Sequence, residues 1–316
     1  MLTYRTFRNT DPPAVAALWR SRQGQPGFNQ PVSVDLLEQL VFAKLYFDYA
    51  GLVLAFDDGR PVGFAHAGFG PSAEKNWVAS DVGVTCVVVT RPDGNEEEAV
   101  SGLLDHCEQY LRSRGAKLLY GGGIAPLDPF WLGLYDGSQL PGVLDSDAVF
   151  RRVLAARGYQ EIERRVTLHR DLGTFEAPVD RRQMLVRRQT SFRVTPDAPT
   201  QTWWEASTLG EFDLTRVELL PRGGGSVLAA ATFRNIEATG TSCVTHGVGL
   251  IALSVDQTYR RRGVATFLLA EAFRHFLRQG VARVETQTSE SDTLALATFH
   301  RLGFQDVGTS GVWRKD

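Results

Sequence analysis

Two segments of the chain follow the same order of elements, and the glycines that end their helices lie 165 positions apart. Residues 250–288 read as an apolar strand, a short basic turn, an amphipathic helix that ends before Gly280, and a second strand. Residues 84–122 read the same way, and their helix ends before Gly115. Such a unit cannot bury its apolar faces alone. Its repetition therefore predicts two packed α/β units, and it limits the possible folds more than any single motif does.

A second pair of segments closes each half of the chain. Residues 147–162 and 292–307 each begin with Asp, continue as a helix, and reach a glycine followed by an aromatic residue. Aspartate is a good helix N-cap, and glycine suits the left-handed position after a helix. These glycines, Gly158 and Gly303, are only 145 positions apart, so the first half carries about 20 extra residues. We expect this insert, residues 124–146, to be an irregular loop that covers a core edge or lines a substrate cavity.

The length of 316 residues fits two domains. Hairpin-like pairs at 52–69 and 226–255 precede the two repeats. Periodicity lapses at 173–182, after a predicted strand, and we place the boundary there, with domains at 1–175 and 176–316. The sequence predicts an α/β protein of two tandem domains.

Composition and charge indicate which kinds of binding partner and which cellular compartment to expect. The net charge of −2 gives no overall attraction to nucleic acid or to an acidic membrane surface. The longest apolar stretch, 247–255, is far shorter than the roughly 20 residues of a spanning helix, and the N-terminus has no apolar signal core. The three cysteines form no CxxC pair, and no His/Cys cluster has zinc spacing. We expect a cytoplasmic protein with no nucleic-acid, membrane or metal partner.

The turn that can carry chemistry lies between the strand and the helix of the second repeat. Arg260-Arg261-Arg262-Gly263-Val264-Ala265 runs into the helix, where backbone N–H groups lack intrahelical partners. Those N–H groups, the helix dipole and the flanking arginines favour a phosphate or a pyrophosphate. Residues 258–283 contain six arginines although the whole chain is nearly neutral. The sequence predicts a local anion site here.

This turn and its surroundings resemble the GCN5-related N-acetyltransferase (GNAT) superfamily, and the whole chain resembles a tandem GNAT protein. In that family an R/Q-x-x-G-x-G/A turn binds the pyrophosphate of acetyl-CoA, and Arg260, Gly263 and Ala265 match it. The resemblance implies two GNAT-like domains, each a mixed, mostly antiparallel central sheet flanked by helices. It implies acetyl-CoA as cosubstrate and no metal. It assigns acetyl-CoA binding to Leu253, Ser254, Val255, Arg260, Arg261, Arg262, Gly263, Val264, Ala265 and Thr266.

The first half departs from this pattern. Alignment of the two helix-ending glycines puts Asn95 at the Arg260 position and Glu98 at the Gly263 position. Residues 96–98 are all glutamates, whose charges repel a diphosphate but suit the positive end of a helix dipole. We therefore expect one cofactor site per chain, in the C-terminal half.

A second departure concerns the proton donor. Many family members place a tyrosine four residues before the glycine of the closing helix, where it protonates the departing thiolate. Here that residue is Phe299, and the adjacent His300 points about 100° away round the helix. Because a thiol has a pKa of about 8.5, a thiolate is a tolerable leaving group, and loss of the acid need not abolish turnover.

An amine acceptor also needs a base, because a lysine-like amine is only about 0.04% neutral at pH 7. The strand that often carries a glutamate base in the family has one titratable group here, His246. Its structural alternative is a strand-end histidine bonded to backbone or solvent. Glu285 and Glu290, on or just beyond the next strand, are rival candidates for a role at the acceptor site.

The leading hypothesis is an acyl-CoA-dependent N-acyltransferase, specifically an N-acetyltransferase that transfers the acetyl group directly to a small-molecule or peptide amine. The acceptor would bind between the halves, and the first half would act as the second subunit does in a GNAT dimer. A monomer would then suffice, although a dimer is compatible. The alternative is a non-catalytic acyl-CoA-binding regulatory module, which Phe299 favours. A Rossmann-type site lacks its G-x-G-x-x-G motif.

Overall fold

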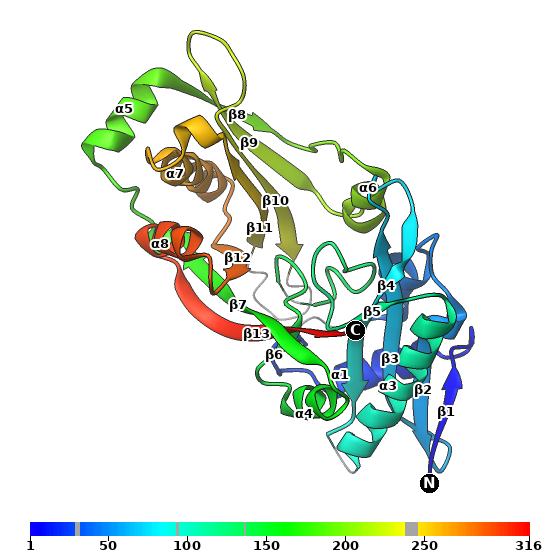
Figure 1. Ribbon diagram of the computed structural model, residues 1–316. Helices are drawn as coiled ribbons and strands as arrows, with labels where there is room; N and C mark the ends of the chain where they lie inside the picture. The colour runs from blue at the N-terminus through cyan, green and yellow to red at the C-terminus, as the bar shows by residue number, and fades with distance from the viewer. Residues whose placement is uncertain (29–31, 93–94, 136, 238–245) are drawn as a thin grey trace. The chain divides into compact units, whose positions relative to one another are not determined.

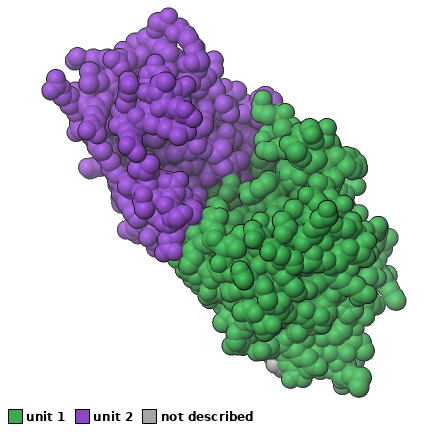
Figure 2. Space-filling model, in the orientation of Figure 1, with its two compact units in different colours: residues 1–165, 200–211, 309–316 green, residues 166–199, 212–308 purple. Residues whose placement is uncertain are grey.

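The computed structural model describes residues 1–28, 32–92, 95–135, 137–237 and 246–316. The chain divides into two compact units, which Figure 2 shows in different colours. Unit 1 consists of Met1–Arg165, Thr200–Glu211 and Thr309–Asp316, and unit 2 consists of Val166–Pro199 and Phe212–Gly308. These compact units are discontinuous in sequence. The expected boundary after residue 175, which separates continuous repeats, therefore stays a prediction.

Unit 1 is built on a mixed sheet (Figure 1). Its strands follow the order β1-β2-β3-β4-β5 and then β13, and neighbouring strands are antiparallel except for the parallel pair β4 and β5. The strands are β1 (Leu2–Thr6), β2 (Leu52–Asp57), β3 (Arg60–Pro71), β4 (Val78–Thr90), β5 (Leu118–Gly121), β6 (Val143–Leu144) and β13 (Gln305–Lys315). The helices are α1 (Pro12–Arg20), α2 (Val34–Leu37), the π-helix η1 (Glu38–Phe42), the 3-10 helix η2 (Tyr49–Gly51), α3 (Glu96–Ser113), α4 (Ala148–Ala156) and α6 (Trp203–Leu209).

Helix α3 covers one face of the unit 1 sheet, against β2, β3 and β4. Its buried residues recur at helical spacing, as the apolar stripe of the sequence predicts. They are Ala99, Val100, Leu103, Leu104, Cys107 and Leu111.

Apart from the short strand β6, the described part of the insert at 124–146 is irregular, as expected, and much of it is buried in unit 1. Phe130, Trp131 and Leu140 belong to the same core cluster as Val87 and Val89 of β4. Trp131 is fully buried and stacks on Trp19, with ring centroids 5.3 Å apart. Buried aromatic rings of this size contribute a large apolar area to a core. The insert therefore completes the core of unit 1.

Unit 2 repeats the mixed arrangement. Its strands follow the order β8-β9-β10-β11-β12, antiparallel except for the parallel pair β11 and β12. The strands are β8 (Thr190–Thr195), β9 (Leu214–Pro221), β10 (Ala229–Glu237), β11 (His246–Val255) and β12 (Arg283–Ser289), while β7 (Gln160–Asp171) has residues in both units. The helices are η3 (Leu172–Thr174), α5 (Arg181–Gln189), η4 (Gln257–Tyr259), α7 (Val264–Arg278) and α8 (Thr293–Arg301). The predicted fold class is confirmed.

The two closing helices show the predicted duplication in detail. The Asp147 side chain accepts a hydrogen bond from the Phe150 N–H at the start of α4 (3.3 Å), and Asp292 caps α8 in the same way. Gly158 and Gly303 have φ values of +83° and +81°, the left-handed conformation that glycine adopts without strain. None of the described helices has the length and apolar run that a membrane crossing requires.

Candidate cofactor-binding site

Strand β11 has an open edge in its C-terminal half. It pairs with β12 only from Gly247 to Leu250, whereas its pairing with β10 continues to Val255. The β10 register shifts so that Ile251 is an extra residue, a β-bulge, at the point where β11 and β12 diverge. Beyond the bulge, no described strand pairs with β11 on the β12 side, and a strand edge of this kind presents backbone hydrogen-bonding groups. The predicted residues Leu253, Ser254 and Val255 lie here.

The loop after β11 is held in a defined shape. Hydrogen bonds from Thr258 keep the pKa of Asp256 below its usual value and close the turn η4. The Arg260 Nε donates to the Val255 carbonyl at 3.2 Å. Arg261 and Gly263 then adopt positive φ values of +59° and +81°. A positive φ is costly for most L-residues, so the glycine is required for the close turn into α7.

The first turn of α7 has no side-chain cap. Gly263 is the N-cap residue and offers no side-chain acceptor, so Val264, Ala265 and Thr266 present N–H groups without intrahelical partners. The positive end of the helix dipole lies at the same place, next to the exposed Arg260, Arg261 and Arg262. The structure thus brings together all the loop residues that the sequence singled out.

Helix α5 contacts this loop through a side-chain hydrogen bond. The Gln183 side chain is buried, and its Nε2 donates to the Gly263 carbonyl at 3.2 Å. Asp180 caps α5 by accepting from the Gln183 N–H, a bond that keeps the pKa of Asp180 low, and it forms a salt bridge with Arg301. No sequence motif pointed to Gln183, because its partner lies 80 positions away.

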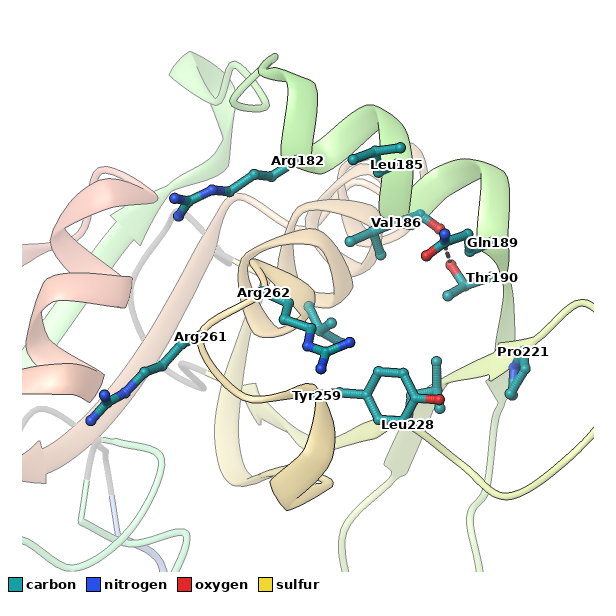
Figure 3. Close-up of a pocket in the computed structure, with 11 residues that line it drawn as sticks. Arg182, Leu185, Val186, Gln189, Thr190, Pro221, Leu228, Tyr259, Arg261 and Arg262 are labelled. Atoms are coloured by element: carbon teal, nitrogen blue, oxygen red, sulfur yellow. Dashed lines mark hydrogen bonds between the residues drawn. The ribbon is translucent and has the colours of Figure 1, made fainter.

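A pocket of about 550 Å³ lies between α5 and the loop (Figure 3). Figure 3 shows Arg182 and Arg261 extending to one side of the loop, whereas Arg262 turns toward Tyr259, its guanidinium carbon 5.6 Å from the ring centroid. Within the described residues, none of these three arginines forms a salt bridge. Arginines without acidic partners leave their charge available to an anion. The pocket is lined by Arg182, Leu185, Val186, Gln189, Thr190, Pro221, Leu228, Tyr259, Arg261, Arg262 and Val264.

Unit 1 has the same strand geometry but a different helix start. Cys86 of β4 is an extra residue opposite β3, at the same 165-residue offset from Ile251 that separates the two repeats. At the start of α3, the Glu96 carboxylate forms a salt bridge with Arg22 and accepts from the Thr90 hydroxyl at 2.9 Å. A carboxylate of the chain itself thus neutralises the cation beside this helix N-terminus.

The three predicted proton-transfer candidates do not lie together. His246 is exposed at the start of β11, where its carbonyl accepts from the Ala282 N–H at 2.8 Å. It precedes the bulge by five residues, about 16 Å of strand. Glu290 is exposed in the turn after β12. Glu285 is buried in β12, opposite Gly249 and one residue before the pairing with β11 ends. Of the three, Glu285 lies beside the divergence of the strands.

Glu285 has a partner that sequence reasoning missed. The His169 Nε2 lies 2.9 Å from the Glu285 Oε2. His169 belongs to β7, which the sequence indicated only as a strand, and the two residues are 116 positions apart. At the closing helix, Phe299 is buried against Phe304 at 5.3 Å, and His300 instead pairs with Asp306.

Comparisons with known proteins agree with this geometry. Residues 183–304 match the family model "Acetyltransferase (GNAT) family". None of the curated proteins matches the sequence. Solved structures share the fold over nearly the whole chain. A GCN5-related N-acetyltransferase from Sphaerobacter thermophilus has a TM-score of 0.65 and 17% identity, with 99% of this chain and 95% of that chain covered.

Two further structures resemble the whole chain. The tandem GNAT protein from the clavulanic acid biosynthesis pathway gives a TM-score of 0.65 at 13% identity, covering 100% of this chain and 98% of that one. The glucosamine N-acetyltransferase region of a fungal multidomain β-N-acetylglucosaminidase gives a TM-score of 0.70 at 17% identity. This chain spans 38% of that protein. Identities this low show the fold alone. Residues 183–304 thus match the acetyltransferase (GNAT) family model, within a chain that shares its overall fold with a tandem GNAT protein.

Proposed function

We propose that the chain is an acyl-CoA-dependent N-acyltransferase that moves an acetyl group from acetyl-CoA to a small-molecule or peptide amine. The observation that carries the proposal is the continuity of one site in unit 2. The open edge of β11 leads directly into an arginine-rich loop and an uncapped helix start. The family of residues 183–304 supports this chemistry in general terms.

The residues fit the charged end of acetyl-CoA. Arg260, Arg261 and Arg262 and the N–H groups of Gly263 to Thr266 would hold its diphosphate through charge-assisted hydrogen bonds. The backbone of Leu253, Ser254 and Val255 would bind the extended arm along the open edge. Backbone N–H groups at the end of that edge would polarise the thioester carbonyl, and the bound geometry would supply proximity.

We propose one cosubstrate site per chain. In unit 1, Glu96 and Arg22 neutralise each other where a phosphate would need the cation. The buried insert also packs against the strand that corresponds to β11: Phe130 and Trp131 share a core cluster with Val87 and Val89. Both features oppose binding of a second acetyl-CoA. The N-terminal half would act as a structural partner of the active half, so one chain would suffice for activity.

The test is isothermal titration calorimetry with acetyl-CoA on the wild type and on Gly263→Glu. We expect one equivalent bound by the wild type, and at least a tenfold loss of affinity in the variant, because a carboxylate then meets the phosphates. Gly280→Glu is the matched control. It has the same φ of +81°, and so a similar backbone strain, but it lies at the far end of α7. Two equivalents per chain, or equal affinities for the two variants, would contradict the site.

Phe299 favours a second candidate, a non-catalytic acyl-CoA-binding module. Its buried ring supplies no hydroxyl at the position where many family members carry the thiolate acid. Steady-state release of free thiol separates the two candidates. An N-acyltransferase releases CoA faster when an amine acceptor is added, whereas a binding module shows the same slow rate with and without amines.

A further inference from the structure

We propose that His169 is the general base of the acyl transfer and that Glu285 positions its imidazole. This inference rests on the proposed function and adds a residue to it. The described structure places the His169 Nε2 2.9 Å from the Glu285 Oε2. The Glu285 side chain is 4% exposed, whereas that of His169 is 27% exposed. The carboxylate is therefore enclosed, and the ring can meet a substrate.

Both side chains lie on the sheet face opposite α7. Their strand neighbours Leu168 and Val284 are fully buried in the core cluster that α7 contributes to. Because successive strand residues point to opposite faces, His169 and Glu285 point away from that core. The pair is thus outside the apolar packing that accounts for most buried side chains of unit 2.

The pair also lies where the thioester must come. Glu285 is opposite Gly249, and the two strands diverge after the next pair, Leu250 and Thr286. The open edge from Ile251 to Val255 spans about 13 Å of strand and connects this point to the arginine loop. An extended cosubstrate held by its phosphates at the loop therefore directs its acyl end toward the divergence.

The hydrogen bond to Glu285 determines what the imidazole can do. A carboxylate accepts a hydrogen bond from a ring N–H, so Nε2 carries the hydrogen and Nδ1 retains a lone pair. Nδ1 can then take one proton from the acceptor ammonium. The neutral amine nitrogen forms the C–N bond as the C–S bond breaks. The second proton, lost from nitrogen as the amide forms, goes to the departing thiolate, so free CoA thiol results.

The other histidines have different surroundings. Complete burial lowers the pKa of His66 to about 3, which removes it from proton transfer near neutral pH. His106 bonds to the Gly102 carbonyl within α3, and His275 lies on α7. The remaining two, His246 and His300, are exposed.

Charged residues lie on the strand of His169 and on the two strands beside it. On its own strand, Arg165 and Asp171 share its face by alternation. On β12 these groups are Glu285, in contact with the ring, and Arg283. On β13, the other neighbour of β7, Asp306 is engaged by His300.

The test measures thiol release from acetyl-CoA with spermidine, glucosamine and a blocked lysine peptide as amine probes. We expect His169→Gln to lower kcat about 10²- to 10⁴-fold with the best amine. The affinity for acetyl-CoA, measured by calorimetry, should stay within twofold. The wild-type kcat/KM should fall as acid protonates the base, and this acid limb should disappear in His169→Gln.

The positioning role of Glu285 has its own readout. Glu285→Gln should lower kcat while the KM for acetyl-CoA stays within twofold, because an amide no longer fixes the ring with Nε2 protonated. Glu285→Asp should recover some of the activity. His300→Gln is the matched control, since His300 also pairs with a carboxylate in unit 2, at 2.7 Å, but both groups are exposed. It should leave kcat and the pH profile unchanged.

The outcomes distinguish a failure of the base assignment from a failure of the proposed function. If His169→Gln keeps kcat within threefold of the wild type, or loses activity and acetyl-CoA affinity in parallel, the base assignment is wrong and the proposed function stands. If the wild type binds acetyl-CoA but no amine accelerates thiol release, the proposed function itself fails, and the base with it.

Discussion

At the starts of α7 and α3, single residues set the local charge, and we propose that this charge decides whether a phosphate can bind. The two helices occupy corresponding positions in the repeat, and each begins where a strand with a β-bulge ends. Arg261 follows the strand in one half, and Glu96 stands at the corresponding place in the other. In the first case the positive charge has no acidic partner among the described residues, and in the second the carboxylate has bound Arg22. In this proposal, the sign of one side chain separates the candidate anion site from a structural salt bridge.

Substitution of Glu96 tests this at the residue scale. Glu96→Gln should lower the free energy of unfolding by about 1–2 kcal/mol, because Arg22 and Thr90 lose a charged acceptor. Glu97→Gln is the control: its pair with Arg152 is 62% exposed on both sides, and we expect a change of at most about 0.5 kcal/mol. Urea denaturation measures both. Equal changes in the two variants would show that the Arg22 contact contributes nothing special.

At the scale of elements, α5 is an addition that the repeat did not predict. The repeat defines β11, α7 and β12, and the sequence indicated only a lapse of periodicity at 173–182, just before α5. In the structure α5 is capped by Asp180, tied to α8 through Arg301, and bonded to the Gly263 carbonyl through Gln183. A loop with two left-handed residues gains a fixed conformation from such contacts, which lowers the ordering cost of binding.

The α5 contact predicts a measurable effect on binding. Gln183→Ala removes the hydrogen bond to the Gly263 carbonyl, and we expect acetyl-CoA affinity to fall about 3- to 10-fold because the loop is less preorganised. Met184→Ala, one position along the same helix and half exposed, should leave affinity unchanged. Calorimetry with circular dichroism as a check on folding measures both. Unchanged affinity in Gln183→Ala would mean that the loop holds its shape without α5.

At the scale of the molecule, unit 1 includes two segments from the second half of the chain. The C-terminal residues Thr309–Asp316 belong to unit 1. There Trp313 packs into the core, Lys315 bonds to Glu108 at 2.7 Å, and β13 pairs with β5. The end of the second repeat therefore completes the core of unit 1. We expect the stability of that core to depend on these C-terminal residues.

Removal of residues 309–316 tests that dependence. We expect faster amide hydrogen exchange in β5 and α3 of unit 1, because the deletion unpairs β5 and exposes core around Trp313. Strands β9 and β10 of unit 2 serve as the internal control and should change much less. Hydrogen exchange with mass spectrometry reads both regions in one experiment. If protection in unit 1 is unaffected, the C-terminal strand is dispensable for its core.

Features encoded within a few neighbouring residues could be predicted from the amino-acid sequence. Asp147 and Asp292 cap their helices, Gly158 and Gly303 take left-handed conformations, and a left-handed Gly263 leads the turn into α7. These follow from local backbone chemistry, which depends on residue type and spacing. The repeat of these signals was enough to predict the tandem fold and the loop of the candidate cofactor site.

Contacts between distant residues emerged only with the folded chain. The bulges at Cys86 and Ile251 carry no residue signature, and the burial of Trp131 was one of two alternatives. The contact of His169 with Glu285 joins strands 116 positions apart, and it depends on strand order and on which face each residue takes. A one-residue change of register would turn either side chain to the opposite face. Such contacts follow from the packing of the whole sheet, which no local pattern encodes.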